Sequence, residues 1–502
     1  MGVLAANFVG PDIAFTDLLP LLVMLGATCA LLLLGSLVPS LPRRTHAVIT
    51  GATSVAVVLL SMRKWHDLGF ETPGTIVSGA VAVDRFAVLS TIIIAVALGL
   101  VALVTHDYAE REGMEGPELF SLFMTAAIGA HIMVSANDLI VLFLGLETLS
   151  LSLYVLAASN RRREQSQEAG LKYFILGGLA SAFFLYGIAM IYGSTGSSNL
   201  TGSATSLADR VSLEDNSALL LVGIGLLLVG LAFKVSAVPF HAWTPDVYEG
   251  APSPVTAFMA SAGKVAAFAA ILRVTTTSLM SRVDDWRPVI WVLAVLTVTV
   301  GSVLAVVQTN VKRMLAFSSV THAGFILIGV EAAAHGTSND GLPSSLTYLL
   351  LYTVLVIGSF SVVSVVAGKG DGATSLDDFA GLAKRRPVLA LAFTVLLLAQ
   401  AGVPFTSGFI AKFGVIKAAV QVDSYAVAVI AMVAAVIGAF LYLRIMVSMW
   451  LQEPASTAAI PVPRATAFAI VLAVGFTLLV GVMPGWLLDA TDLVRAAKSI
   501  DG

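Results

Sequence analysis

Four charged side chains lie deep inside long apolar runs of the sequence. The runs are LIVLFLGLETLSLSLYVLA around Glu147, LLLVGLAFKVSAVPF around Lys234, VTAFMASAGKVAAFAAIL around Lys264 and VPFTSGFIAKFGVIKAAV around Lys412. A charge left unpaired in the middle of a bilayer costs about 2.5–3.5 kcal/mol, so four of them would cost about 10–14 kcal/mol. That sum is comparable with the net stability of a whole domain. These groups must therefore be paired, hydrated or both.

The chemistry that suits this set of residues is a proton or cation relay. A static ion pair that only fixes helix packing explains it less well, because one carboxylate cannot neutralise three lysines. A buried lysine can release its proton near neutral pH, and a nearby carboxylate favours the charged form. A small movement of Glu147 towards or away from Lys234 would then load or unload a proton.

Three further residues are candidates for the same relay. His322, in MLAFSSVTHAGFILIGV, fits a relay and a hydrogen-bonded core histidine equally well. His241 follows Pro239 at a predicted helix end, where a relay or gating role is favoured. Lys172 lies near the start of its apolar run, so it fits either a relay or a side chain that extends to the membrane surface.

The composition indicates a membrane protein with many helices. Of the 502 residues, 58% are hydrophobic and 12% are charged, against roughly 45–50% and about 25% in ordinary soluble domains. The single Cys29 excludes an internal disulfide and a thiolate-held zinc or iron–sulfur cluster. No GxGxxG or GxxxxGK[ST] motif follows a strand pattern, so we expect no cofactor-binding and no metal site in this chain.

Fourteen apolar windows are long enough to cross a bilayer. They are 18–38, 46–62, 85–105, 118–136, 138–158, 168–193, 217–238, 252–277, 288–308, 312–331, 344–367, 387–419, 424–450 and 464–484. The seventh window contains Lys234 and ends before Pro239, and the twelfth is interrupted by Gly402-Val403-Pro404. Because proline opens the helix and frees backbone carbonyls, we expect broken helices at both places.

Two broken helices five spans apart cross the membrane in opposite directions, which is typical of inverted repeats in transporters. The sequence predicts an all-α polytopic membrane protein in which helices 4–8 and 9–13 form two inverted five-helix repeats. The predicted parts are 1–117 (helices 1–3), 118–277 (first repeat), 288–450 (second repeat) and 464–502 (helix 14 and a tail). Loops after odd-numbered windows carry about 13 Lys and Arg against 8 elsewhere, so we expect both termini to face the outside.

Residues 233–268, FKVSAVPFHAWTPDVYEGAPSPVTAFMASAGKVAAF, resemble the central motif of the antiporter-like, proton-translocating membrane subunits. The HAWTPDVYEGAP version is most similar to the subunit N family of bacterial NADH-quinone oxidoreductase, respiratory complex I. The stretches LFLGLETLSLSLYVLAA, VKRMLAFSSVTHAGFILIG and AGVPFTSGFIAKF resemble the same family, so that the similarity covers roughly residues 120–450. The family's channel residues match Glu147, Lys234, Lys264 and Lys412, with Lys172 and His241 as further matches.

The resemblance implies a proton-pumping subunit of NADH:quinone oxidoreductase in the inner (plasma) membrane of a bacterium. It implies that NADH, FMN, the iron–sulfur clusters and quinone are bound by partner subunits. The expected neighbours are the antiporter-like subunit M and the small membrane subunits K, J and A.

Other functions remain open from the sequence. A subunit of a multisubunit Na+/H+ antiporter shares the fold and the lysines, although the YEGAP segment argues against it. A transporter for a small solute would have a polar pocket richer in Asn, Gln, Asp or Arg. A membrane scaffold that conducts no ions has no use for buried charges, and their free-energy cost therefore argues against it.

Overall fold

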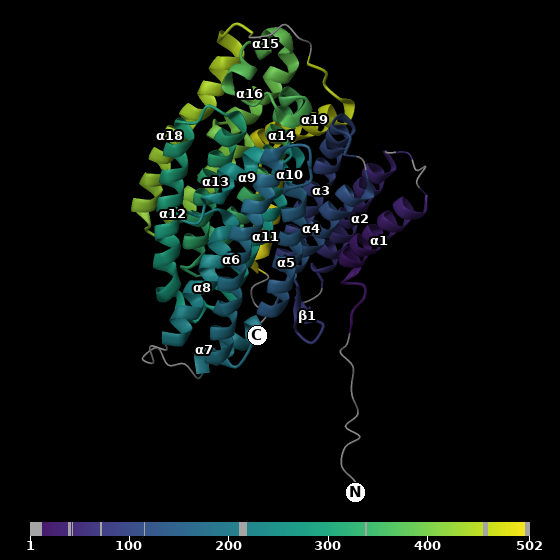
Figure 1. Cartoon of the computed structure of the whole chain (residues 1–502). Coiled ribbons are helices and arrows are strands. Elements are labelled where there is room, and N and C mark those ends of the chain that lie inside the picture. Colours follow the sequence, from purple (N-terminus) through teal and green to yellow (C-terminus); the bar gives the residue numbers. More distant parts are fainter. Residues whose placement is uncertain are drawn as a thin grey trace.

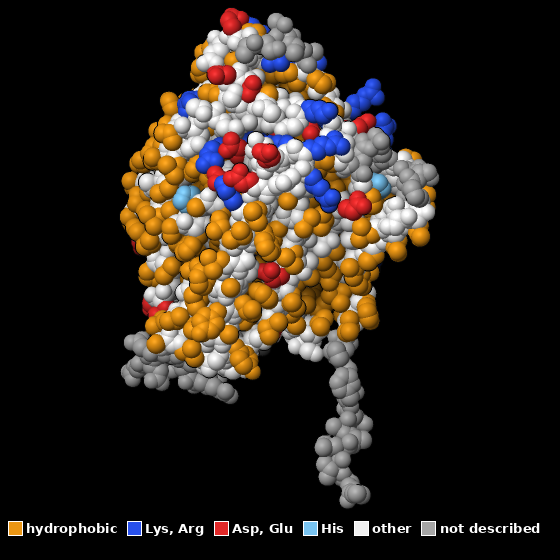
Figure 2. Space-filling view, viewed as in Figure 1, with side chains coloured by type: hydrophobic (Ala, Val, Ile, Leu, Met, Phe, Trp, Pro, Cys, Tyr) orange, Lys and Arg blue, Asp and Glu red, His pale blue; other side chains and the backbone are white. Residues whose placement is uncertain are grey.

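The computed structural model describes residues 13–38, 42, 44–70, 73–114, 116–209, 218–336, 339–454 and 460–496. The outer ends of the first and last predicted parts, residues 1–12 and 497–502, lie outside these ranges. The described chain is a bundle of long, roughly parallel helices that run between two ends of the molecule (Figure 1). Apolar side chains form a broad belt around this face of the bundle, and most Lys, Arg, Asp and Glu side chains gather above it (Figure 2).

The first half of the bundle holds three helices and the first predicted repeat. Its elements are α1 (Leu19–Leu37), α2 (Arg44–Asp67), β1 (Gly74–Ile76), β2 (Val81–Val83), α3 (Arg85–Glu112), α4 (Pro117–Ser135), α5 (Leu139–Ala157), α6 (Glu164–Thr195), α7 (Leu200–Asp209), α8 (Ala218–Val235), α9 (Trp243–Gly250), α10 (Ser253–Phe258), the π-helix η1 (Met259–Gly263), α11 (Lys264–Arg273) and the π-helix η2 (Val274–Ser278). The two strands form an antiparallel hairpin, which the sequence analysis did not predict.

The second half repeats the pattern of long helices. Its elements are the 3₁₀ turn η3 (Met280–Arg282), α12 (Val283–Val306), α13 (Val311–Ala333), α14 (Gly341–Ala367), the 3₁₀ turns η4 (Lys369–Asp371) and η5 (Leu376–Phe379), α15 (Leu382–Arg385), α16 (Pro387–Ala401), α17 (Ser407–Gln421), α18 (Tyr425–Leu451), α19 (Arg464–Val482) and α20 (Gly485–Ala496). The α20 helix lies beyond the last predicted window and packs against α14.

The predicted windows are confirmed by the helices. Within the described residues, 13 helices are long and apolar enough to cross a membrane. They coincide with all the windows except 387–419, which is divided between α16 and α17. Both predicted breaks are present, since α8 ends at Val235 before α9 begins at Trp243, and α16 ends at Ala401 before α17 begins at Ser407.

Small residues bring neighbouring helices close together. A Cβ atom on Gly129 of α4 would lie 2.3 Å from the backbone nitrogen of Leu149 on α5, and one on Gly324 of α13 would lie 2.5 Å from that of Val298 on α12. Such contacts are the usual way in which helices associate in lipid, where burying apolar surface gives no advantage. The α4–α5 and α12–α13 pairs are therefore closely packed.

Candidate functional site

The break after α8 places Lys234 in the interior. Ser236 has a positive φ of 64°, so the helix cannot continue through it. The freed groups find partners across the break: Val238 N donates to Thr297 Oγ1 at 2.9 Å, and the Trp243 indole donates to the Phe233 carbonyl at 3.1 Å. The Lys234 side chain at this break is only 8% exposed.

The Lys234 ammonium has no hydrogen-bond partner among the described residues. Its Nζ lies 5.3 Å from the ring centroid of Tyr154 and 5.3 Å from that of Tyr173. Aromatic faces attract a cation, but they neither accept nor donate its proton. Lys234 is thus held in place by rings, and its proton is not committed to any acceptor.

Glu147 lies on α5 and is not part of a static ion pair. Its Oε1 accepts a hydrogen bond from the Ser181 hydroxyl of α6. Among the residues that the structure describes, no Lys or Arg nitrogen lies within 4.0 Å of its carboxylate. The hypothesis that Glu147 only pairs with a lysine to fix helix packing is therefore not supported by the geometry.

Lys264 follows a π-helical turn. The segment η1 ends at Gly263, and Lys264 is the first residue of α11; such turns are frequent at functional sites because they shift the next side chain out of α-helical register. Lys264 is 1% exposed, and its Nζ donates to the Ser319 carbonyl of α13 at 2.5 Å. This contact connects the first half of the bundle to the second.

His322 lies one turn further along α13, surrounded by tyrosines. Its Nδ1 lies 2.6 Å from the Tyr348 hydroxyl and its Nε2 lies 3.2 Å from the Tyr442 hydroxyl. The ring of Tyr352 lies against the imidazole, with 4.7 Å between the centroids. Both ring nitrogens are therefore hydrogen-bonded, so that a proton can enter His322 on one side and leave it on the other.

A chain of polar side chains continues from Tyr442 to the second break. The Tyr442 and Ser318 hydroxyls are 2.6 Å apart, and Ser318 donates to Gln400 Oε1 at 3.3 Å. Gln400 in turn donates to the Ser359 hydroxyl at 2.6 Å. Gln400 stands two residues before Gly402, at the end of α16, so this chain joins His322 to the break.

Lys412 lies on the other side of that break. Its Nζ donates to the Ala401 carbonyl at 2.9 Å, a group that is free to accept because the helix ends there. The Nζ also lies 5.1 Å from the ring centroid of Phe325. Gly402 adopts a positive φ of 91°, and a Cβ there would lie 2.9 Å from Lys412 Cδ.

The close approach of α17 to α16 gives a test of this geometry. A Gly408→Ala variant should lower stability by about 1–3 kcal/mol, because its Cβ would lie 1.7 Å from the Ala399 carbonyl oxygen. The midpoint of thermal unfolding of the purified assembly measures the effect. Gly414→Ala on the same helix is the control, since the nearest atom is the Ser344 hydroxyl at 3.3 Å. Equal midpoints for the two variants would contradict the described packing.

Within the part of the chain that the structure describes, Lys172 and His241 form no hydrogen bond or ion pair with the other predicted site residues. Lys172 forms ion pairs with Glu168 at 2.7 Å and Asp246 at 2.8 Å, and 41% of its side chain is exposed. His241 lies in the segment between α8 and α9 and is partly buried, and its Nδ1 has no partner within the described residues. Whether either residue conducts protons stays a prediction.

The buried ion pair between Arg273 and Asp84 is an example of a purely structural pair. Arg273 and Asp84 form two hydrogen bonds, of 2.8 and 2.9 Å, and Arg273 also donates to the Val134 carbonyl. Burial alone would raise the pKa of Asp84, but the Arg273 guanidinium and backbone N–H groups hold that pKa below its ordinary value. Every group in this pair is satisfied, whereas Lys234 is not.

Sequence reasoning missed two features. One is the hydrogen-bond chain from His322 to Gln400, for which the only sequence signal is a glutamine inside the apolar run of α16. The other is Lys312, the first residue of the 312–331 window, which is fully buried, with its Nζ 3.2 Å from Asp371 Oδ2. The aspartate that pairs with it is 59 residues away, so nothing near Lys312 in the sequence indicates this pair.

Comparison with known proteins assigns this chain to a known family. A family model described as NADH:quinone oxidoreductase/Mrp antiporter, TM, matches residues 136–438, a range that includes every predicted site residue. The NADH-quinone oxidoreductase subunit N of Rhodococcus opacus is 41% identical over 97% of this chain and 97% of that relative. The chain belongs to the NADH-quinone oxidoreductase subunit N family.

Solved structures agree with this assignment. A chain of respiratory complex I from Thermus thermophilus is similar to this member of the subunit N family, with a TM-score of 0.79, 32% identity, and coverage of 94% of this chain and 99% of that chain. A chain of the Mrp complex from Dietzia sp. DQ12-45-1b has a TM-score of 0.81 and 21% identity, with coverage of 96% of this chain and 97% of that chain. The similarity to the Mrp chain, at this low identity, shows only that the two chains share a fold.

The subunit N family and the apolar helices together make this chain a multi-pass membrane protein. Within the part of the chain that the structure describes, no group of three or more His, Cys, Asp or Glu side chains is arranged to hold a metal ion.

Proposed function

We propose that this chain is a proton-pumping membrane subunit of NADH:quinone oxidoreductase. It moves protons from the cytoplasm to the outside, driven by redox chemistry in partner subunits. The observation that supports this proposal is the buried row of Lys264, His322 and Lys412 along α13. Lys264 bonds to the Ser319 carbonyl of α13, His322 is part of α13, and Lys412 Nζ lies 5.1 Å from the Phe325 ring centroid of α13.

The proposed route begins at Lys234 and Glu147, near the first break. It continues laterally through Lys264 and His322 and reaches Lys412 at the second break. The hydroxyls of Tyr442 and Ser318 and the amide of Gln400 extend from His322 to the end of α16, where the Ala401 carbonyl accepts from Lys412. Hydroxyl groups both donate and accept, so they can pass a proton along when water joins them. We keep His241 and Lys172 as proposed participants on the cytoplasmic side, where Lys172 meets the carboxylates of Glu168 and Asp246.

The proposed orientation follows from the positive charges. Lys and Arg gather above the apolar belt in Figure 2, whereas α1 begins and α20 ends towards the opposite end in Figure 1. The charged end then faces the cytoplasm, and both termini face the outside of the plasma membrane. The proposed inverted repeats, 118–277 and 288–450, would each contribute one broken helix and one half of the route.

In the proposed assembly the neighbours are other complex I subunits, among them subunits M, K, J and A. NADH, FMN, the iron–sulfur clusters and quinone are bound by partner subunits, and this chain supplies only the proton route.

A Lys234→Ala variant should assemble normally but pump protons about tenfold more slowly or worse, since positioned acid–base groups contribute roughly 10²–10⁴-fold to proton transfer. Assembly is expected to survive because Lys234 Nζ has no hydrogen-bond partner among the described residues that the substitution would leave unsatisfied. Proton uptake into vesicles with NADH and quinone measures the effect. Lys369→Ala, an exposed lysine, is the control. Unchanged pumping in Lys234→Ala would favour a scaffold.

Purification of the chain with its partners in mild detergent separates the proposal from the alternative of a multisubunit Na+/H+ antiporter. Flavin and iron–sulfur subunits with NADH:quinone reductase activity are expected. Recovery with membrane subunits alone, without NADH oxidation, would contradict the proposal and favour the antiporter.

A further inference from the structure

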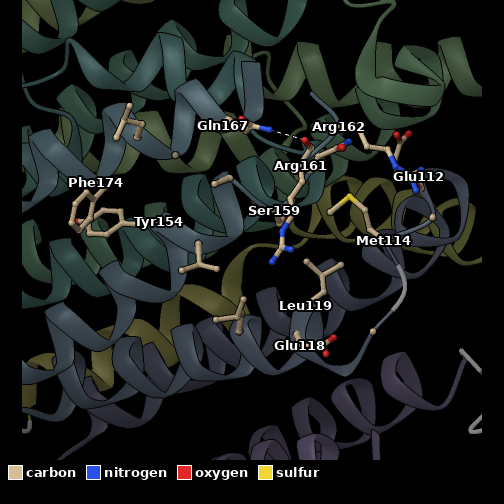
Figure 3. Close-up of a pocket in the computed structure, with 18 residues that line it drawn as sticks. Glu112, Met114, Glu118, Leu119, Tyr154, Ser159, Arg161, Arg162, Gln167 and Phe174 are labelled. Atoms are coloured by element: carbon tan, nitrogen blue, oxygen red, sulfur yellow. Dashed lines mark hydrogen bonds between the residues drawn. The ribbon is translucent and has the colours of Figure 1, made fainter. Parts of the chain in front are cut away.

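A cavity of about 940 Å³ lies apart from the buried row. It is formed by α4, α5 and α6 and by the segments that lead into α4 and α6 (Figure 3). Among the labelled side chains, Glu112 and Arg162 lie on one side, Tyr154 and Phe174 lie on the other, and Arg161 and Ser159 lie between them (Figure 3). The cavity is therefore polar at one end and aromatic at the other.

The charged side chains of the lining are two arginines and two glutamates. Arg161 and Arg162 both line the cavity and are exposed. Glu112 also lines it, but its carboxylate is engaged with Arg111 at 3.2 Å and with the Gly370 N–H at 2.8 Å. Glu118, on the opposite wall, is the other carboxylate of the lining. Because the Glu112 carboxylate is engaged with Arg111, which lies outside the lining, the exposed guanidinium groups of Arg161 and Arg162 can bind an anionic group.

Two buried hydroxyl groups in the lining have no partner among the described residues. They are the Tyr154 hydroxyl and Ser159 Oγ. Both oxygens are buried, and that of Tyr154 lies against Gly177 of α6, so the arginines are the polar groups that a ligand in the cavity can reach.

The aromatic end opens onto the apolar surface of the bundle. Val155, Leu171 and Phe174 line the cavity and are 55%, 59% and 54% exposed. Side chains of this kind on a membrane helix face lipid chains or another apolar surface. The occupant must therefore be anionic at one end and apolar at the other.

We propose that this cavity binds an anionic phospholipid of the leaflet at the charged end of the bundle. Its phosphate lies against Arg161 and Arg162, which are suited to bidentate binding of phosphate oxygens. Its acyl chains run along Leu171 into the bilayer. Basic pockets between membrane helices at the cytoplasmic side bind lipids of this kind, and the volume is within the range of ligand pockets.

The site also touches the proton route. The ring of Tyr154 that lines the cavity lies 5.3 Å from Lys234 Nζ, so one aromatic ring separates the lipid from Lys234. The lipid closes the cavity side of that ring to water. Binding of the lipid does not depend on the proposed function, and the two are tested separately.

The first test measures lipid retention by the intact complex. An Arg161→Gln/Arg162→Gln double variant, purified with its partner subunits and washed in detergent, should retain one anionic phospholipid fewer per complex by native mass spectrometry. Added phosphatidylglycerol should bind at least about tenfold more weakly than to the unsubstituted complex. Lys384→Gln/Arg386→Gln removes two exposed positive charges outside the cavity and should retain the lipid. Equal retention in both double variants, or equal binding of phosphatidylcholine and phosphatidylglycerol, would overturn the proposal.

The second test identifies the occupant directly and does not depend on the arginine variants. A photoreactive p-benzoylphenylalanine at position 171 of the otherwise unchanged complex should form a lipid adduct on illumination. A crosslink to a neighbouring polypeptide at that position would overturn the proposal in favour of a subunit interface.

Discussion

A Lys412→Ala variant should assemble and yet lose proton pumping by about tenfold or more. The side chain is the last buried amine of the row, and its Nζ is held by the Ala401 carbonyl at the break of the α16–α17 helix pair. Without it, no basic group lies at the break that the hydrogen-bond chain from His322 reaches at Gln400. Proton uptake into vesicles that contain the purified complex, normalised to NADH oxidation, measures the loss.

Two companion variants show whether Lys412 carries the proton or only a charge. Lys412→Arg keeps the positive charge, but arginine does not deprotonate in proteins, so pumping should stay as low as in Lys412→Ala. Lys417→Ala is the matched control on α17, because Lys417 is 54% exposed and pairs with Asp340 at 2.9 Å. Normal flux in Lys412→Arg would show that a fixed charge is sufficient, and normal flux in Lys412→Ala would remove Lys412 from the route.

The buried charges were predictable from the sequence because the membrane makes them so costly. A lysine or glutamate in the middle of an apolar run stands out in any bilayer-spanning segment, and the structure places Lys234, Lys264 and Lys412 in the interior. The breaks beside Lys234 and Lys412 were also predictable, since proline or glycine interrupts the run at each. The roles of these residues remain predictions.

The hydrogen-bond chain from His322 to Gln400 was not predictable from the sequence, because burying any one of its uncharged side chains in a membrane costs little free energy. Tyrosine, serine and glutamine are tolerated in apolar helices when they find partners, so Tyr442 and Ser318 look like ordinary helix residues. They are 124 residues apart in the sequence, and only the packing of α18 against α13 brings them together. Hydrogen bonds between uncharged side chains that are far apart in the sequence leave no local sequence pattern.

The structural role of Asp371 could not be predicted from the sequence either, because its partners are far away in the chain. It follows α14 in a short turn with a positive φ of 48°, and its side chain is fully buried. It accepts hydrogen bonds from Lys312 at 3.2 Å and from the backbone and hydroxyl of Ser253 at 3.0 Å each. The guanidinium groups of Arg163 and Arg111 lie 3.5 and 3.7 Å away. One carboxylate thus joins α13, α10, α6 and α3.

An Asp371→Asn variant should therefore destabilise the chain by about 3–5 kcal/mol, the cost of leaving a buried charge without its partner. Asparagine has nearly the same shape and tolerates a positive φ, so the loss reflects the charge of Lys312, which has no exposed surface. The amount of assembled complex in membranes and its thermal midpoint should both fall. Asp377→Asn, at an exposed position, should leave both unchanged. Adding Lys312→Met to Asp371→Asn should restore most of the lost stability, since the double variant buries no unpaired amine. If the double variant is no more stable than Asp371→Asn, the other contacts of Asp371, and not its ion pair with Lys312, hold the four helices together.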